Sequence, residues 1–227
     1  MRYEAVFFDL FGTLVKIFSR QEYEQVLAQV AGVLMASGQD FTRLWRETFD
    51  DRVRGVFPTT EAGLAHICRL LDIDADDARI AAAAQLRFDY VRRSLAPRGD
   101  AVETLSELRT MGHKVGLISD CSPEIPQVWE ETELVSLVEA PVFSCVVGLK
   151  KPDPHIYHLA CERLAVDSRA CLYVGDGGSR ELTGAAQVGM HPVLIRDRDE
   201  RDAFRVDGED WDGSTISTLR EVLRLVR

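Results

Sequence analysis

The stretch that decides the fold is YEAVFFDLFGTL, at residues 3–14. It begins as a short apolar run, stops abruptly at Asp9 and continues into the turn-forming pair Gly12-Thr13. A short apolar run bounded by turn residues is typical of a buried strand. We therefore expect a strand whose carboxyl end delivers Asp9 to a loop.

The chain from Ser19 to about Leu95 has a helical pattern throughout, with no strand pattern in it. Ser19 and Glu22 have the spacing of a capping box, which predicts a helix start. Apolar residues then recur at helical spacing in four successive segments: one after Ser19, one over 41–49, one after Thr60 and one over 76–91. The pattern predicts a block of helices inserted after the first strand.

Beyond Pro97 and Gly99 the pattern changes to alternating strands and helices. We expect strands over 114–118, 143–147, 171–174 and 192–195, and helices over 101–111, 155–164, 181–188 and 215–226. Such alternation predicts the α/β class, with a doubly wound parallel sheet. The predicted domains are an α/β core formed by residues 1–16 and 96–227, and an α-helical domain formed by residues 17–95.

Composition and charge exclude several classes of partner. The net charge is −10 and no Lys/Arg-rich run is present, so we expect no nucleic-acid partner. No apolar run approaches the roughly 18 residues of a membrane span, and the first residues do not form a signal peptide, so we expect no membrane partner. An odd number of cysteines without a CxxC pair predicts reduced thiols in a cytoplasmic protein. The oligomeric state is not predicted.

Polar side chains follow three of the predicted strands at the point where each strand ends. These residues are Asp9, Ser119 and Asp176. Ligands of open α/β sheets bind beyond the carboxyl ends of the strands, so we expect the three to converge. A single aspartate in such a place is more often a helix N-cap, but three converging residues favour a site. Two facing carboxylates repel one another unless a cation lies between them, and Mg²⁺ suits few carboxylates plus water and phosphate oxygens.

Lys151 supplies a positive side chain for this site. It lies in GLKKPDP, residues 148–154, just before a predicted helix. A lysine there can neutralise phosphate charge and a nucleophilic carboxylate together. The neighbouring Lys150 is expected to be exposed, and Pro-Asp-Pro is expected to stiffen the loop and begin the helix.

Four segments, taken in order, resemble the haloacid dehalogenase superfamily of hydrolases, and the resemblance covers essentially the whole chain. The matching segments are FFDLFGTL at 7–14, GLIS at 116–119, KPDP at 151–154, and VGD at 174–176 extended through Glu181 to Gly184-Ala185 and Gly189-Met190. The resemblance implies that family's Rossmann-like core, with an inserted α-helical cap over residues 17–95. It also implies a hydrolase.

The resemblance implies a role for each matching residue. Asp9 would attack the phosphorus of a small phosphorylated substrate and form an aspartyl-phosphate. Ser119 and Lys151 would hold the phosphoryl oxygens, assisted by backbone N–H groups. These N–H groups would come from the residues after Asp9, namely Phe11 and Gly12, and from Asp120. Thr13 would orient the nucleophile loop.

The resemblance further implies a Mg²⁺ cofactor. Its ligands would be Asp9, the backbone carbonyl of Phe11, and Asp176. Glu181 stands where the family usually has a second acid, and it would hold a metal-bound water.

One departure from the family pattern concerns Phe11. Family phosphatases usually carry a second aspartate two residues after the nucleophile. That aspartate protonates the leaving group and then activates water, which is worth roughly 10²–10⁴ in rate. Phenylalanine does neither. Position 120 is also Asp where Asn is commoner, which adds negative charge near the site.

Three interpretations fit Phe11. The first is a phosphatase whose leaving group needs little protonation, such as an acyl phosphate or anhydride, or whose acid comes from the cap or the substrate. The second is a 2-haloacid dehalogenase, since those enzymes resemble this chain in placing an aromatic residue two after the nucleophile. They use no metal, however, and lack the acid corresponding to Asp176, so we rank this interpretation second. The third is a non-enzymatic phospho-accepting switch or scaffold.

Cap residues are expected to select the substrate. Five arginines are candidates for binding an anionic group, and the sequence favours no single one: Arg20, Arg43, Arg46, Arg52 and Arg54. Trp45 and Phe49, at helical spacing, are expected in the core of the cap.

Overall fold

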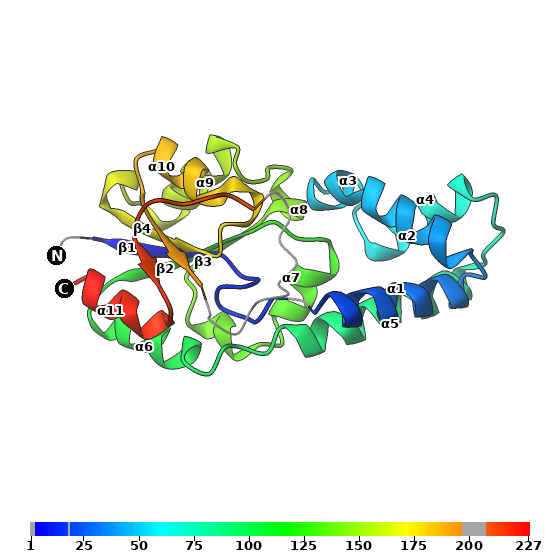
Figure 1. The fold of residues 1–227 in the computed structure, drawn as a ribbon, viewed down its shortest axis with the longest axis horizontal. Coiled ribbons are helices and arrows are strands. Elements are labelled where there is room, and N and C mark those ends of the chain that lie inside the picture. Colours follow the sequence, from blue (N-terminus) through cyan, green and yellow to red (C-terminus); the bar gives the residue numbers. More distant parts are fainter. Residues whose placement is uncertain (1–2, 18, 197–207) are drawn as a thin grey trace.

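The computed structural model describes residues 3–17, 19–196 and 208–227. The described chain contains a six-stranded parallel sheet in the order β3-β2-β1-β4-β5-β6. The strands are β1 Ala5–Phe8, β2 Lys114–Ser119, β3 Ala140–Phe143, β4 Cys171–Gly175, β5 His191–Ile195 and β6 Thr215–Ile216. Figure 1 shows this sheet between two layers of helices. The predicted α/β class with a doubly wound parallel sheet is confirmed.

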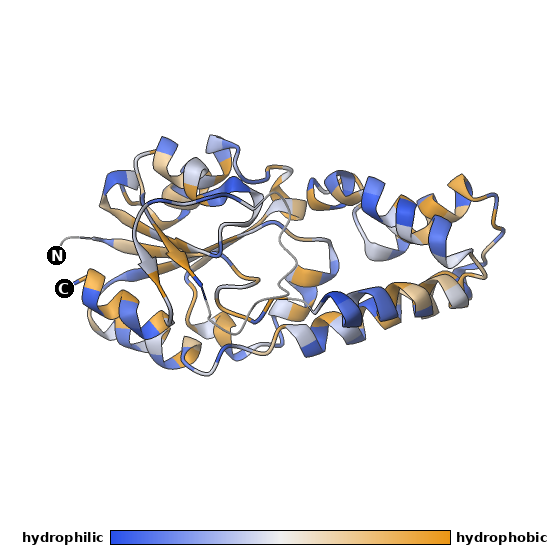
Figure 2. Cartoon of the chain, viewed as in Figure 1, coloured by the Kyte–Doolittle hydropathy of each residue, from blue (hydrophilic) through white to orange (hydrophobic). Residues whose placement is uncertain are grey.

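Both faces of the sheet are buried, which explains why β1 is apolar throughout. Val6 and Phe8 belong to one core cluster, whereas Ala5 and Phe7 belong to the other. Successive side chains of a strand point to opposite faces, so a strand covered on both sides has no polar position. Figure 2 shows hydrophobic residues along these strands.

The helices of the two layers come from the part of the chain that alternates with the strands. Helices α9 Pro154–Leu164 and α10 Glu181–Gln187 cover one face, and α6 Ala101–Thr110 and α11 Val222–Leu225 cover the other (Figure 1). Shorter helices connect them: α7 Glu124–Trp129, α8 Ser144–Val147, and the 3₁₀ helices η1 Glu133–Ser136, η2 Ser168–Ala170, η3 Gly178–Arg180 and η4 Leu219–Glu221. No helix in the described ranges combines the length and the apolar character that a bilayer crossing requires.

The strand order explains why distant residues meet. β1 lies between β2 and β4, and Phe8 is in register with Leu117 and with Val174. The chain winds to one side of β1 through β2 and β3, and to the other side through β4, β5 and β6. The point where the winding reverses is where open α/β sheets bind their ligands. The residues that follow β1, β2 and β4 therefore share one edge of the sheet.

A helical lobe extends from this edge of the sheet (Figure 1). It consists of α1 Arg20–Val33, α2 Gly38–Glu47, α3 Phe49–Val53, α4 Thr60–Leu70 and α5 Asp77–Ser94. The lobe has its own buried apolar cluster, which includes Leu27, Phe41, Trp45 and Leu64. Ser19 caps α1 by accepting a hydrogen bond from the backbone N–H of Glu22, as the spacing predicts. The domain limits at 16/17 and 95/96 stay a prediction.

Two predicted elements were wrong. The strand predicted over 143–147 is instead β3 at Ala140–Phe143 followed by helix α8, which ends at Gly148 with a left-handed φ of 73°. β3 is an edge strand, where Pro141 is tolerated although it lacks an N–H group. The helix predicted over 215–226 begins later, because Thr215 and Ile216 pair with β5 and a capping box at Thr218 starts the helical turns.

Candidate active site

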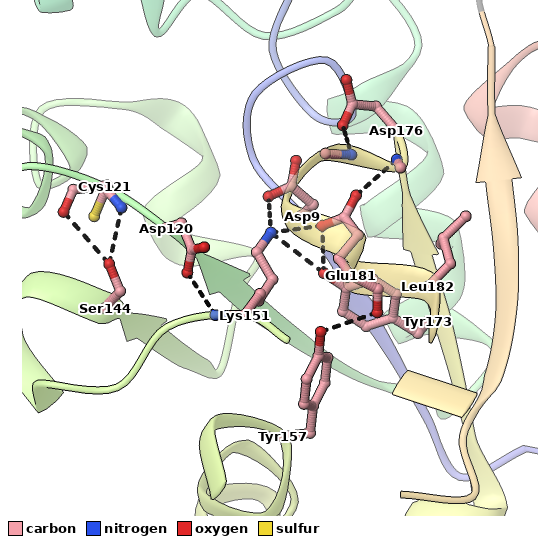
Figure 3. Close-up of polar contacts among 12 residues, drawn as sticks. Asp9, Asp120, Cys121, Ser144, Lys151, Tyr157, Tyr173, Asp176, Glu181 and Leu182 are labelled. Atoms are coloured by element: carbon pink, nitrogen blue, oxygen red, sulfur yellow. Dashed lines mark hydrogen bonds and ion pairs between the residues drawn. The ribbon is translucent and has the colours of Figure 1, made fainter. Parts of the chain in front are cut away.

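The predicted site residues occupy one edge of the sheet. Asp9 follows β1, Ser119 ends β2, Asp176 follows β4 and Glu181 begins α10. Lys151 reaches toward Asp9 and Glu181 from the loop before α9 (Figure 3). All five side chains are buried. Asp9 is held in place by its backbone N–H group, which donates to the carbonyl of Val174 at 2.9 Å.

Lys151 lies between two of the acids. Its Nζ donates to Oδ1 of Asp9 at 2.6 Å and to Oε2 of Glu181 at 2.5 Å. Burial alone lowers the pKa of Lys151, but the carboxylates of Asp9 and Glu181 outweigh it and raise this pKa well above its ordinary value. The ammonium group therefore stays charged, and it fixes the orientation of the Asp9 carboxylate.

The acids together carry more negative charge than Lys151 neutralises. Carboxylate oxygens of Asp9, Asp176 and Glu181 lie within 4.8 Å of one another. Burial raises the pKa of Asp9 to about 6, with Asp176 adding to the rise and Lys151 opposing it. Burial likewise raises the pKa of Glu181 to about 8, with Asp9 adding to it. Buried carboxylates this close together suit a hard divalent cation such as Mg²⁺.

Glu181 fits an indirect role at such a cation better than direct ligation. Its Oε1 accepts from the backbone N–H of Gly177 at 2.9 Å, and its Oε2 accepts from Lys151 and from the hydroxyl of Tyr173 at 2.8 Å. Both oxygens are therefore engaged with protein donors. Through these contacts Glu181 positions Lys151, and its role in holding a metal-bound water stays a prediction.

The loops that carry Asp9 and Asp176 are in close contact at Gly12. Gly12 has a φ of +80°, and a Cβ at this position would lie 2.5 Å from Oδ2 of Asp176. A residue with a side chain would be strained and would also displace the carboxylate. The second carboxylate oxygen of Asp176, Oδ1, accepts a hydrogen bond from the backbone N–H of Gly178 at 2.9 Å. The sequence therefore needs glycine here to bring the two acids together.

Three further predicted residues have distinct positions. Asp120 accepts from the backbone N–H of Lys151 at 3.0 Å, so it holds the lysine loop, and burial raises its pKa. The hydroxyls of Ser119 and Thr13 are buried and have no hydrogen-bond partner among the described residues. A buried hydroxyl without a partner at a strand end is suited to a substrate oxygen. The structure shows no hydrogen bond between Thr13 and Asp9.

A cavity of about 150 Å³ lies between this edge of the sheet and the helical lobe. The sheet side contributes Asp9, Phe11, Asp120, Lys151, Asp176 and Glu181, and the lobe contributes Tyr23, Trp45, Phe49, Arg52 and Arg87. Gly12, Thr13 and Ser119 are not among the lining residues. Phe11 is among the lining residues on the sheet side.

Sequence reasoning missed two tyrosines of the site. The hydroxyl of Tyr173 donates to Glu181, and that of Tyr157 donates to the backbone carbonyl of Glu181 at 2.9 Å. Both rings are fully buried. A fully buried tyrosine usually finds a hydrogen-bond partner, so Tyr173, in the middle of the apolar strand β4, was a usable signal.

The doubly wound parallel sheet, the lysine-bound aspartate after its first strand and the cavity between sheet edge and helical lobe are those of an α/β protein that binds a ligand at the carboxyl ends of its strands. A family model for haloacid dehalogenase-like hydrolases matches residues 3–189. The chain belongs to this family and is a hydrolase.

Similar proteins include both phosphatases and dehalogenases. The chain is 30% identical to a glyceraldehyde 3-phosphate phosphatase of Methanopyrus kandleri, over 71% of this chain and 70% of that protein. It is 28% identical to an (S)-2-haloacid dehalogenase of Pseudomonas sp. (strain YL), over 98% and 94%. Among solved structures, a family enzyme from Bacteroides thetaiotaomicron in complex with magnesium and inorganic phosphate superposes with a TM-score of 0.66. That enzyme is 16% identical, and the match covers 92% of this chain and 98% of that one.

Proposed function

We propose that this protein is a Mg²⁺-dependent phosphatase of a small phosphorylated compound, with Asp9 as the covalent nucleophile. The observation that carries the proposal is the buried cluster of Asp9, Asp176 and Glu181, of which Asp9 and Glu181 are paired with Lys151. Halide leaves carbon without a proton or a metal, so dehalogenation gains nothing from such a cluster. Phosphoryl transfer gains from the cluster, because a cation held by these acids would neutralise negative charge around the phosphorus.

The residues have complementary roles in this proposal. Lys151 orients Asp9 and neutralises phosphoryl charge, and the hydroxyl of Ser119 binds a phosphoryl oxygen. Asp9, the backbone carbonyl of Phe11, and Asp176 would hold Mg²⁺, and Glu181 would hold it through water. When bound, the ion supplies charge neutralisation and positions the phosphoryl group. The magnesium and phosphate in the Bacteroides enzyme and the phosphatase activity of the Methanopyrus relative support the proposal. A cytoplasmic location is part of it, consistent with five free cysteines.

The test is phosphate release from an aryl phosphate, from alkyl phosphates and from acyl phosphates, each measured with Mg²⁺ and with a chelator. We expect release in Mg²⁺ and none in chelator. Release that is equally fast in chelator would remove the cation from the proposal. No release from any phosphate in the presence of Mg²⁺ would remove the phosphatase function.

Dehalogenation is the second candidate, and Phe11 favours it together with the near-complete coverage by the Pseudomonas dehalogenase. It predicts chloride release from 2-chloropropionate without added metal, and absence of chloride above background excludes it. The switch interpretation predicts neither activity. It predicts instead a label on Asp9 from acetyl phosphate that persists for minutes.

Phe11→Asp should raise the turnover of alkyl phosphates more than that of acyl phosphates. The new carboxyl would lie in the cavity lining, where it protonates a poor leaving group, and general acid catalysis is worth roughly 10²–10⁴. An acyl phosphate gains less because its leaving group needs little protonation. Phe11→Asn is the matched control, since it is polar but not acidic. Equal gains for both substrate types would show that the acid comes from elsewhere.

Magnesium should stabilise the protein more at about pH 8 than at about pH 5.5. The pKa values of Asp9 and Glu181 rise to about 6 and about 8 from ordinary values of 3.8 and 4.5. The folded acids thus bind protons more tightly than the unfolded ones. The metal-free protein therefore loses stability as pH rises through this window, while Lys151 stays protonated throughout.

The measurement is the thermal midpoint with and without Mg²⁺ at the two pH values. At the lower pH protons compete with the cation for Asp9, so the shift should be small. Identical magnesium shifts at both pH values would argue that the cation binds away from these acids.

A further inference from the structure

Arg52 of the helical lobe is a buried guanidinium held in a fixed orientation. The side chain is only 4% exposed, and its guanidinium carbon lies 3.7 Å from the centroid of the Trp45 ring. Its Nη1 donates to the carbonyl of Trp45 at 2.6 Å and to Oγ1 of Thr48 at 2.7 Å. Stacking and two hydrogen bonds on one nitrogen leave Nε and Nη2 without a partner in the described part of the chain. A rigid guanidinium with unused donors is a preorganised anion receptor.

Arg87 also lines the cavity from the lobe, and it has a partner of its own. Its Nη2 donates to Oε1 of Glu124 at 2.8 Å, and both side chains are buried. The guanidinium of Arg87 also lies 5.0 Å from the centroid of the Trp45 ring, on which Arg52 stacks. The guanidiniums of Arg52 and Arg87 therefore have one neighbouring carboxylate, that of Glu124, which leaves one positive charge unbalanced. A buried unbalanced charge is costly unless a ligand of opposite sign completes the site.

The guanidinium of Arg52 stays positively charged at neutral pH. Burial lowers the pKa of Arg52 to about 10, with the charge of Arg87 adding to the fall against the opposing effect of Tyr23. Arg52 forms no ion pair with any described residue, in contrast to Arg43 and Arg54 of the same lobe, which pair with acids on the surface. Of the five arginines that the sequence analysis gave as candidates for binding an anionic group, Arg52 is the one that lines the cavity.

One cavity joins the arginines of the lobe to the acids and the lysine at the sheet edge. Arg52 and Arg87 line it from the lobe, and Asp9 and Lys151 line it from the sheet. A substrate whose phosphoryl group lies at Asp9 therefore extends toward Arg52. A cavity of about this volume accommodates roughly one benzene-sized molecule, so the substrate has a short chain.

We propose that Arg52 binds a carboxylate of the substrate, so that this hydrolase acts on short molecules with a phosphoryl group at one end and a carboxylate at the other. The phosphoryl half of this inference rests on the proposed function; the carboxylate half rests on the lobe. A planar carboxylate matches the two remaining donors of a guanidinium. Because Glu124 already neutralises Arg87, a single excess charge remains, which matches a monoanionic carboxylate rather than a second, dianionic phosphate.

The direct test is calorimetric titration of the Mg²⁺-loaded protein with 3-hydroxypropionate, and with 1,3-propanediol as its neutral counterpart. Neither probe needs turnover. We expect the acid to bind and the diol not to bind. Arg52→Gln should weaken binding of the acid by about tenfold to hundredfold, and Arg43→Gln, on an exposed face of the same lobe, should leave it unchanged. If Arg52→Gln does not fold, Arg52→Lys keeps the charge but loses the planar fork, and a partial loss is expected.

The inference is overturned if the acid fails to bind the wild-type protein, if the diol binds equally well, or if folded Arg52 variants bind the acid as tightly as wild type. A second readout separates it from the proposed function. With 3-phosphooxypropionate and propyl phosphate as substrates, Arg52→Gln should raise KM for the first alone. Equal KM effects on both would contradict the carboxylate site only. Absence of phosphate release from both, with Arg52-dependent acid binding intact, would contradict the phosphatase only.

Discussion

Asp9→Asn is expected to lower Mg²⁺-dependent phosphate release by about four orders of magnitude or more, as loss of a covalent nucleophile does in other enzymes. The amide keeps the shape of the carboxylate and can still accept from Lys151, but it is a poor nucleophile and a poor ligand for Mg²⁺. The measurement is the steady-state rate of phosphate release from the best substrate of the screen.

Asp74→Asn is the matched control for this prediction. Asp74 is exposed on the helical lobe and does not line the cavity, so its turnover should equal that of wild type. Thermal denaturation checks that Asp9→Asn is folded. A folded variant that retains wild-type turnover would refute nucleophilic attack by Asp9.

Glu124→Ala is expected to destabilise the protein by about 3–5 kcal/mol, the typical cost of breaking a buried ion pair. Glu124 in α7 of the core is fully buried, and it accepts from Arg87 of α5 and from Thr60 of α4. Its removal leaves a buried guanidinium without a counter-charge and removes the buried contacts of Glu124 with two helices of the lobe. Urea denaturation measures the loss in free energy of unfolding.

An exposed ion pair between the same parts of the chain supplies the control. Arg92 of α5 lies 2.7 Å from Glu131, just after α7, but both side chains are about half exposed, at 46% and 50%. Glu131→Ala should change stability too little to resolve, because solvent screens exposed pairs. The double variant Arg87→Met/Glu124→Met should recover much of the lost stability, since it leaves no unpaired charge. Equal losses for Glu124→Ala and Glu131→Ala would contradict the importance of burial.

The fold was predictable because the strands carry their signal locally. The apolar run before Asp9 and the similar run before Asp176 are buried on both faces, and each ends where its polar residue begins. The strand over 143–147 was misplaced because Cys-Val-Val has the composition of a strand. Its conformation was decided by Gly148, whose left-handed backbone ends a short helix, and by pairing of residues 140–143 with β2.

The candidate site was predictable only as far as the sheet determines it. Strand order brings Asp9 and Asp176 together, and the sequence shows which residues end the strands. The engagement of Glu181 with Lys151 depends on how α10 packs against the sheet, which no local pattern encodes. Arg87 was missed for a related reason. It lies in an alanine-rich helix that contains several arginines, and only packing against α7 determines which of them is buried.

The most direct test of the account is the chemical state of Asp9 during turnover. The protein is mixed with Mg²⁺ and a phosphorylated substrate and quenched in acid, and the tryptic peptide over residues 3–16 is analysed by mass spectrometry. The account predicts that this peptide gains the mass of one phosphoryl group, that hydroxylamine removes it, and that Asp9→Asn never acquires it. An unmodified peptide during rapid turnover, or a phosphoryl group on a different residue, would contradict the account.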